Sequence, residues 1–404
     1  MATYPVGRAP RRPLIPMGSR SRARIQTIRA KLPIILGVLD TIAIVAYIIH
    51  AELLVFQAAA LGLKLLLLPV LLRQRSSAVL QLPVLFCFTL CCILSLVFAL
   101  FPTPGAILQI VGFLSNLTLT LMLLPEEVGP YLRTTSIVIT LYNFIYCIAA
   151  AIGRIPVFEG RHQYFNGAEP NLGAEIAAMG VVAGAMTLNL PRFMMVVIPA
   201  LIVAVLTQGR AAILAIALTV MLKLYRSVFL SQQNSRLRLW VFASLPFLLA
   251  GALASLPYLM TSLMLSDKDR GFGGGVSGRG ELWLNALHFF QMRPLTGIGL
   301  GGYGALKLLP PHNFILYAMA EMGLLSFAVF AIMGYLAVCC YRLRGAPTIY
   351  LLMLLPLVMF NARLFNLNIY PFALFVALFA LSARDVPARA RSWRRALPFR
   401  LTHQ

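Results

Sequence analysis

The sequence alternates long apolar stretches with short connections over most of its length. A helix of about twenty apolar residues spans the hydrocarbon core of a bilayer, and backbone polar groups can be satisfied there only within helices or closed barrels. Of the 404 residues, 60% are hydrophobic and only 11% are charged, which excludes an ordinary soluble globular protein. The sequence therefore predicts an all-α polytopic membrane protein with about twelve transmembrane helices.

The predicted spans follow the apolar stretches along the chain. They lie near residues 32–49, 53–72, 78–100, 105–124, 134–152, 172–190, 193–208, 211–228, 239–260, 312–340, 346–362 and 366–383. The corresponding regions are a basic head (1–31), helices one to nine (32–260) with an outer loop (153–171), a large outer loop before the tenth helix (261–311), helices ten to twelve (312–383) and a basic tail (384–404).

The formal net charge of +22 lies largely in the arginine-rich head and tail. In a soluble protein such a charge would suggest a nucleic-acid partner, but here it is better explained by membrane topology and contact with lipid headgroups. With both termini in the cytoplasm, most Lys and Arg residues fall on the inner side, as the positive-inside rule requires. We therefore predict membrane lipids, and no nucleic acid, as partners. The six cysteines lie within apolar spans and form no metal-binding or disulfide pattern.

Cations on the outer side run against that rule and draw attention to function. Arg210 lies in the turn Thr207-Gln-Gly-Arg, which is short enough to hold it where two spans meet. A guanidinium there either extends to the lipid headgroups or grips a phosphate through two parallel hydrogen bonds. The spacing alone leaves both interpretations open.

The large outer loop contains an amphipathic segment that begins at Arg279 and includes Trp283. Its apolar residues recur at helical spacing, which predicts a helix lying along the membrane surface. Arg279 would anchor this helix at the headgroups, and an anchored arginine can also contact a lipid-linked pyrophosphate.

His312 follows two prolines and begins the predicted tenth span. A helix N-terminus favours the neutral imidazole, which can act as a general base, although a lone histidine is more often structural. Asn313 is a candidate capping partner. Glu321 lies nearly opposite His312 around the helix, so we expect a buried carboxylate paired with a cation on a neighbouring span.

The smaller outer loop gathers polar and aromatic residues on the same side of the membrane as His312. They are Arg161, His162, Tyr164, Asn166 and Asn171. Such a set suits a sugar acceptor, although loops of this composition are often only turns.

Two further patterns are interpreted as structural. Gly297, Gly299 and Gly302 fit GxGxxG, but no strand precedes them. Asp267 and Asp269 could bind a divalent metal, but a solvated charge cluster is favoured.

Four stretches, in this order, resemble signatures of the O-antigen ligase and polymerase family of bacterial envelopes. They are RHQYFNGAEPN (161–171), QGR (208–210), GRGELW (278–283), and PLTGIG followed by HN and EMG (294–323). QGR lacks the family's usual serine. The stretch between Arg279 and His312 is short for a ligase that docks a lipid A core, so a polymerase stays as an alternative.

The resemblance implies an inverting transfer of a glycan from undecaprenyl pyrophosphate to an acceptor hydroxyl, such as one on lipid A core. The reaction would take place on the periplasmic face of the bacterial inner membrane, without a cofactor or a metal. It implies that Arg210 and Arg279 neutralise the pyrophosphate and that His312 is the base. The other implied site residues either contact substrate (Arg161, Asn171, Asn313, Trp283, Tyr164) or support the site (Glu321, Gly297, Gly299). More distant alternatives are a polysaccharide or lipid transporter and a metal-dependent glycosyltransferase.

Overall fold

The computed structural model describes four long segments and several short pieces of the chain. The long segments are residues 125–158, 161–164, 170–228 and 279–328; the short pieces are 31–39, 41–42, 62, 66, 90–91, 93–95, 97, 99, 330–331, 350, 353 and 357. The predicted spans near 53–72, 105–124, 239–260, 346–362 and 366–383 lie wholly or largely outside these residues, as do the basic head and tail. The described part is mostly helical, and the total of about twelve spans stays a prediction.

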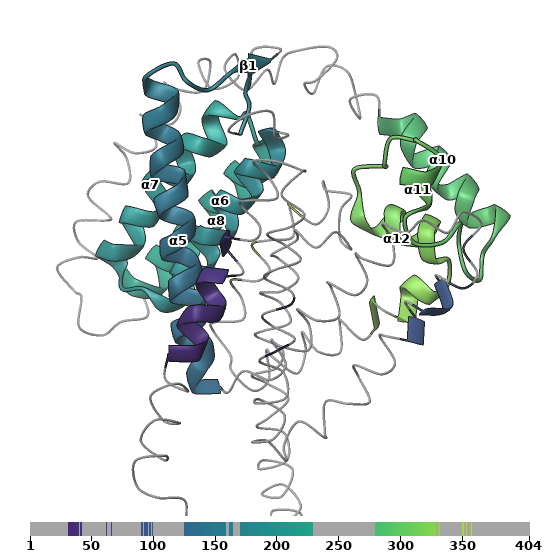
Figure 1. The fold of residues 1–404 in the computed structure, drawn as a ribbon, viewed down its shortest axis with the longest axis horizontal. Coiled ribbons are helices and arrows are strands. Elements are labelled where there is room, and N and C mark those ends of the chain that lie inside the picture. The colour runs from purple at the N-terminus through teal and green to yellow at the C-terminus, as the bar shows by residue number, and fades with distance from the viewer. Residues whose placement is uncertain are drawn as a thin grey trace, which may run out of the picture.

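Four helices pack into one group: α5 (Pro125–Ala151), α6 (Pro170–Thr187), α7 (Leu190–Leu206) and α8 (Arg210–Val228). Helix α6 contacts each of the other three (Figure 1). Three of these helices begin and end within a few residues of their predicted bounds. Helix α5 instead begins at Pro125, well before residue 134, and proline is well suited to the first position of a helix.

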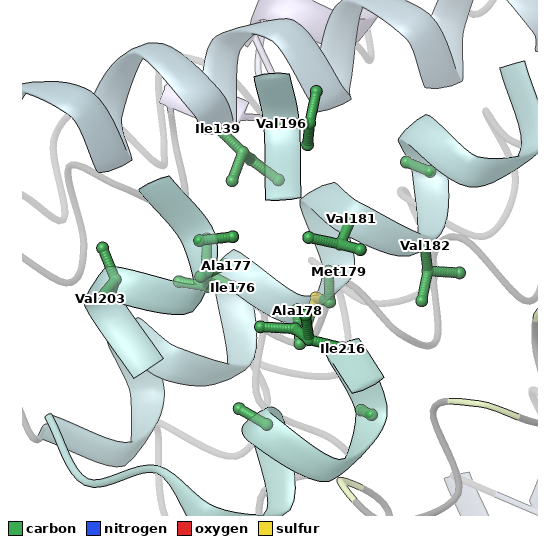
Figure 2. Close-up of a cluster of buried hydrophobic side chains, with 14 of the residues drawn as sticks. Ile139, Ile176, Ala177, Ala178, Met179, Val181, Val182, Val196, Val203 and Ile216 are labelled. Carbon is green, nitrogen blue, oxygen red and sulfur yellow. The ribbon is translucent and has the colours of Figure 1, made fainter. Parts of the chain in front are cut away.

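Helix α6 is the centre of this group because it is buried on nearly every side. Figure 2 shows Ile139 of α5, Val196 of α7 and Ile216 of α8 around its residues 176–182. Glycine and alanine on α6 let the neighbouring backbones approach closely, so that van der Waals packing holds the helices together where lipid supplies no hydrophobic driving force.

Two of the described helical segments, Gly129–Ala151 and Arg210–Val228, are long and apolar enough to cross a membrane. Helix α7 is a shorter apolar helix. One side of α5 carries exposed large apolar side chains, which are Ile137, Leu141, Phe144, Ile145 and Ile148. Such an exposed apolar face would be unusual in water but is suited to lipid.

We expect Gly180→Ala to lower the thermal unfolding temperature in detergent, because a Cβ atom at Gly180 would lie 2.6 Å from Cγ2 of the buried Ile139. Overpacking of this kind costs roughly 1–3 kcal/mol. The matched control is Gly129→Ala on α5, where nothing lies within 4 Å of the added Cβ. An unchanged unfolding temperature for Gly180→Ala would contradict the close contact between α5 and α6.

Two cations cap the C-terminal end of α6. Lys223 of α8 donates to the carbonyl oxygens of Ala185 (2.7 Å) and Leu188 (2.8 Å), and Arg133 of α5 donates to that of Thr187 (3.4 Å). The last carbonyl groups of a helix lack partners within it and carry partial negative charge, so cations are stabilising there. Arg133 and Lys223 therefore mark the C-terminal end of α6, which is opposite to the end at which α6 begins.

A short hairpin precedes α6 and adds two strands to the predicted all-α architecture. Strands β1 (Val157–Phe158) and β2 (Arg161–His162) are antiparallel, with Val157 paired to His162. The Tyr146 hydroxyl of α5 donates to the carbonyl oxygen of Gln163 (3.0 Å) and so ties the end of the hairpin to the helices.

A second group consists of α10 (Arg279–Met292), α11 (Gly302–Ala305) and α12 (Phe314–Met322), with α10 packed on α12 (Figure 1). The predicted helix at Arg279 is confirmed. The prediction of one continuous helix from residue 312 to 340 is wrong, because α12 ends at Met322 and helical structure resumes at residue 325. Gly323 adopts a left-handed φ of 57° there, and the N–H of Leu324 turns to the carbonyl oxygen of Pro294 (2.7 Å).

Candidate active site

Arg161 joins three elements at the end of the helical group where α6 begins. Its Nη2 donates to Oδ1 of Asn171 (2.7 Å) at the start of α6 and to the carbonyl oxygen of Thr207 (3.0 Å) after α7. Its Nε donates to the same carbonyl oxygen (3.2 Å). The side chain is half-buried, so the guanidinium of β2 is fixed in place rather than free to move in solvent.

The turn between α7 and α8 brings Arg210 to this same end. Gln208 has a left-handed φ of 54°, and Gly209 is buried so closely against Ala174 of α6 that its position has no room for a Cβ. Uncommon backbone conformations of non-glycine residues cluster at functional sites. Arg210 is half-exposed and begins α8, where the partial positive charge of the helix N-terminus adds to its own. Arg161, through its contact with Thr207, and Arg210, three residues further along the chain, therefore both lie at the end of the helical group where α6 begins.

Tyr164, at the end of the same hairpin, packs against α5 and α6. Its side chain is 0% exposed, its ring stacks on Tyr146 with centroids 5.1 Å apart, and it fills the space beside Gly173 of α6. Burial raises the pKa of its hydroxyl far above the usual range, so the group stays neutral. A side chain enclosed in this way packs the hairpin against α5 and α6, and its contact with substrate stays a prediction.

We expect Arg161→Ala to leave α5–α8 folded but to loosen the hairpin, because the Thr207 carbonyl and the Asn171 side chain each lose a charged partner. Leaving such groups unsatisfied costs roughly 1–3 kcal/mol. Limited proteolysis and backbone amide exchange across residues 153–171 measure the effect. Arg154→Ala, at an exposed arginine on the same connection, is the control. Equal protection of the two variants would contradict the anchoring role of Arg161.

His312 lies in a turn that two neighbours hold. The indole Nε1 of Trp283 on α10 donates to the carbonyl oxygen of Pro311 (2.9 Å), directly before His312. After it, Asn313 is the N-cap of α12 and accepts from the backbone N–H of Leu316 (3.1 Å), which confirms its predicted capping role. His312 itself is half-buried and has a left-handed φ of 47°.

Arg279 and His312 belong to the same structural unit. Arg279 is the first residue of α10, one turn before Trp283, whose indole contacts the residue that precedes His312. Trp283 was predicted to bind substrate. Its indole N–H connects α10 to the His312 turn, and its contact with substrate stays a prediction.

Glu321 is buried, as predicted, whereas its cationic partner on a neighbouring span stays a prediction. Its side chain is 1% exposed, and in the described part of the chain its carboxylate accepts from the backbone N–H groups of Gly301 (3.1 Å) and Tyr303 (3.3 Å) rather than from a cation. Backbone amides satisfy a carboxylate without a second charge, as they do at helix N-termini.

The glycines of residues 297–303 are required by the way this loop lies against α12. Gly297 (φ 65°) and Gly299 (φ 93°) adopt left-handed conformations that glycine tolerates. A Cβ at Gly297 would meet the carbonyl oxygen of Ala320 at 2.5 Å, and one at Gly299 would collide with Ala99. The loop with the GxGxxG pattern therefore binds the side chain of Glu321, which is consistent with the prediction that the pattern has a structural role.

The hydrogen bonds and ring contacts described above lie within each of the two groups of site residues. In Figure 1 the α5–α8 group and the α10–α12 group lie on opposite sides of the view. The sequence analysis did not predict that the carbonyl oxygen of Thr207 accepts hydrogen bonds from Arg161, because every residue has such a carbonyl group. It also did not predict the left-handed backbone of Gln208, although this residue lies within the QGR stretch that was singled out. Among the described residues there is no group of three or more His, Cys, Asp or Glu that could hold a metal, and Asp267 and Asp269 lie outside them.

Residues 195–331 match the family model of the O-antigen ligases. The match starts within α7 and ends after α12, so it includes Arg210, Arg279, His312 and Glu321 but not the Arg161 hairpin. It confirms the predicted resemblance to this family. No curated protein matches the chain.

Proposed function

We propose that this chain, as a protein of the O-antigen ligase family, transfers a glycan from undecaprenyl pyrophosphate to a hydroxyl group of lipid A core with inversion at the anomeric carbon. The family match supports a membrane glycosyltransferase of the ligase or polymerase type. The observation that carries the proposal is that the matched segment contains both a half-exposed arginine at a helix N-terminus and a half-buried histidine in a held turn.

The proposed reaction balances without a cofactor. The acceptor hydroxyl gives its proton to His312, and its oxygen forms a bond to the anomeric carbon of the donor sugar. The bond from that carbon to the pyrophosphate oxygen breaks, and the electron pair leaves with undecaprenyl pyrophosphate. Arg210 and Arg279 stabilise the negative charge that grows on the leaving oxygen.

Arg161 and Asn171 form the boundary of the donor or acceptor site beside Arg210. Their mutual hydrogen bond and the two bonds from Arg161 to Thr207 set the position of the turn that carries Arg210. A turn held in this way is pre-organised, so that a lipid-linked anion is bound without first ordering the loop.

The positions of the cations support a site on the periplasmic face. Arg133 and Lys223, which belong to connections predicted to be cytoplasmic, lie together at the C-terminal end of α6. Arg161 and Asn171 lie at the opposite end, where α6 begins. This arrangement agrees with the orientation that the positive-inside rule predicts.

The test is glycan transfer by the purified full-length protein in detergent, with an undecaprenyl-pyrophosphate glycan as donor, lipid A core as acceptor, and a metal chelator present in one arm. Transfer to lipid A core that persists in the chelator supports the proposal. Loss of transfer in the chelator, restored by a divalent metal, would favour the metal-dependent alternative.

A polymerase of the same family is the second candidate, and the short stretch between Arg279 and His312 favours it. The same assay separates the two. A ligase attaches the glycan to lipid A core, whereas a polymerase lengthens the lipid-linked glycan and leaves lipid A core unmodified.

A further inference from the structure

We infer that Glu321 is a positioning residue for glycan transfer: its carboxylate locks the loop 294–303 against α12 and thereby holds Arg279 and His312 in one rigid unit. This inference rests on the proposed function. It assigns to a buried carboxylate a role in catalysis that requires no contact with substrate.

The lock begins with the carboxylate and extends along the end of α12. Besides the N–H groups of Gly301 and Tyr303 at the side chain, the N–H of Gly299 donates to the backbone carbonyl oxygen of Glu321 (2.9 Å). The N–H of Ile298 donates to Ala320 (2.9 Å), and the hydroxyl of Ser95, far away in the sequence, also donates to the carbonyl oxygen of Glu321 (3.2 Å). The loop is thus bonded to the last turn of α12 at several successive positions.

Tyr303 carries this connection from the loop to both helices. Its backbone N–H binds Glu321, and its ring stacks on Tyr317 of α12 with centroids 5.4 Å apart. Its other contact is edge-to-face with Phe289 of α10, at 5.7 Å. Tyr303 is 3% exposed, so it fills the space between α10 and α12. When the carboxylate holds the backbone of Tyr303, it therefore also fixes how the two helices pack.

Both proposed catalytic residues of this group depend on that packing. Arg279 begins α10, and Trp283 one turn later holds the carbonyl oxygen of Pro311 beside His312. If the loop loosens, α10 and the His312 turn lose their common support. A shift of about 1 Å at a reacting group can lower a rate by about 100-fold.

A carboxyl group suits this role better than an amide. The donors that face it include the backbone N–H groups of Gly301 and Tyr303 and the Tyr317 hydroxyl, and a glutamine amide would replace one acceptor oxygen with an NH2 group that cannot accept from the N–H groups. Glu321→Gln should therefore break part of the lock with little change in side-chain volume. Glu321→Asp keeps both acceptor oxygens, but its side chain is shorter by one methylene, and it should retain part of the function.

The experiment compares wild type, Glu321→Gln, Glu321→Asp, His312→Asn and the control Glu281→Gln in the full-length protein, in the glycan-transfer assay. Glu281 is an exposed carboxylate in the first turn of α10. We expect kcat to fall by roughly 10–100-fold in Glu321→Gln with KM for the donor nearly unchanged, a partial recovery in Glu321→Asp, and wild-type rates in the control. Backbone amide exchange should rise in residues 297–303 and 311–313.

Each outcome decides the inference. A wild-type kcat in Glu321→Gln, or a change in KM alone, would overturn it. If Glu321→Gln does not fold in detergent, Glu321→Asp carries the same comparison, and a wild-type kcat there overturns the lock. Absence of transfer by the wild-type protein would instead refute the proposed function. In that case, faster backbone amide exchange of residues 297–303 in Glu321→Gln would still show that the Glu321 carboxylate holds this loop in the fold.

Discussion

Replacement of His312 by asparagine is expected to reduce glycan transfer by roughly 10²–10⁴-fold, because the acceptor hydroxyl loses the group that takes its proton. Asparagine is chosen because residue 312 has a left-handed φ of 47°, which asparagine tolerates better than alanine. The variant thus removes the base and leaves the backbone of the turn in place. The measurement is kcat at saturating donor and acceptor.

The matched control is His288→Asn on the exposed face of α10. It should retain wild-type activity, because His288 lies away from the His312 turn along the helix. If His312→Asn folds with the wild-type unfolding temperature and keeps full activity, His312 is not the base. If activity and unfolding temperature fall together, His312→Gly, which also tolerates the left-handed backbone, provides a second test. A loss in His312→Asn that is larger than its change in stability explains supports the catalytic role.

Replacement of Arg210 by alanine is expected to lower kcat by roughly 10²–10³-fold, the loss typical of removing one group that stabilises charge in a transition state. Arg210→Lys should recover only part of this loss, because an ammonium cannot form the two parallel hydrogen bonds that a guanidinium offers to phosphate. Since Arg210 begins α8 beside a fixed turn, neither change should unfold the helix.

Arg293→Lys is the control for Arg210→Lys, since Arg293 is an exposed cation directly after α10. Its activity should equal that of wild type. The result that would contradict the role of Arg210 is a variant with unchanged kcat and a raised KM for the acceptor. Such a variant would place Arg210 at the acceptor rather than at the leaving pyrophosphate.

The helices were the most predictable feature because length and apolarity decide them locally. The bounds of α6, α7 and α8 agree with the predicted spans to within a few residues, and the amphipathic pattern after Arg279 correctly indicated α10. The interruption at Gly323 was not predictable from apolarity, since the sequence is apolar on both sides of it. Only the docking of Leu324 on Pro294 shows why the helix ends there.

The candidate site was predictable in its residue types and only partly in its contacts. Arg161 and Asn171 were expected to act together, and they are hydrogen-bonded. Tyr164 was expected to meet substrate and is enclosed in the packing of α5 and α6. The sequence cannot distinguish an aromatic loop residue that contacts substrate from one that is buried, because burial depends on which helix covers the residue.

By itself, the sequence determined the places of α6, α7, α8 and α10 and the resemblance of residues 195–331 to the O-antigen ligases, because these depend on apolar length and on short ordered motifs. The tertiary structure alone decided which partners the polar residues have. The Arg161 guanidinium meets a carbonyl 46 residues away, and the Glu321 carboxylate meets two backbone amides of the loop before α12. Every residue carries a backbone N–H or carbonyl oxygen, so their use as partners leaves no trace in the residue types and appears only when the chain is folded.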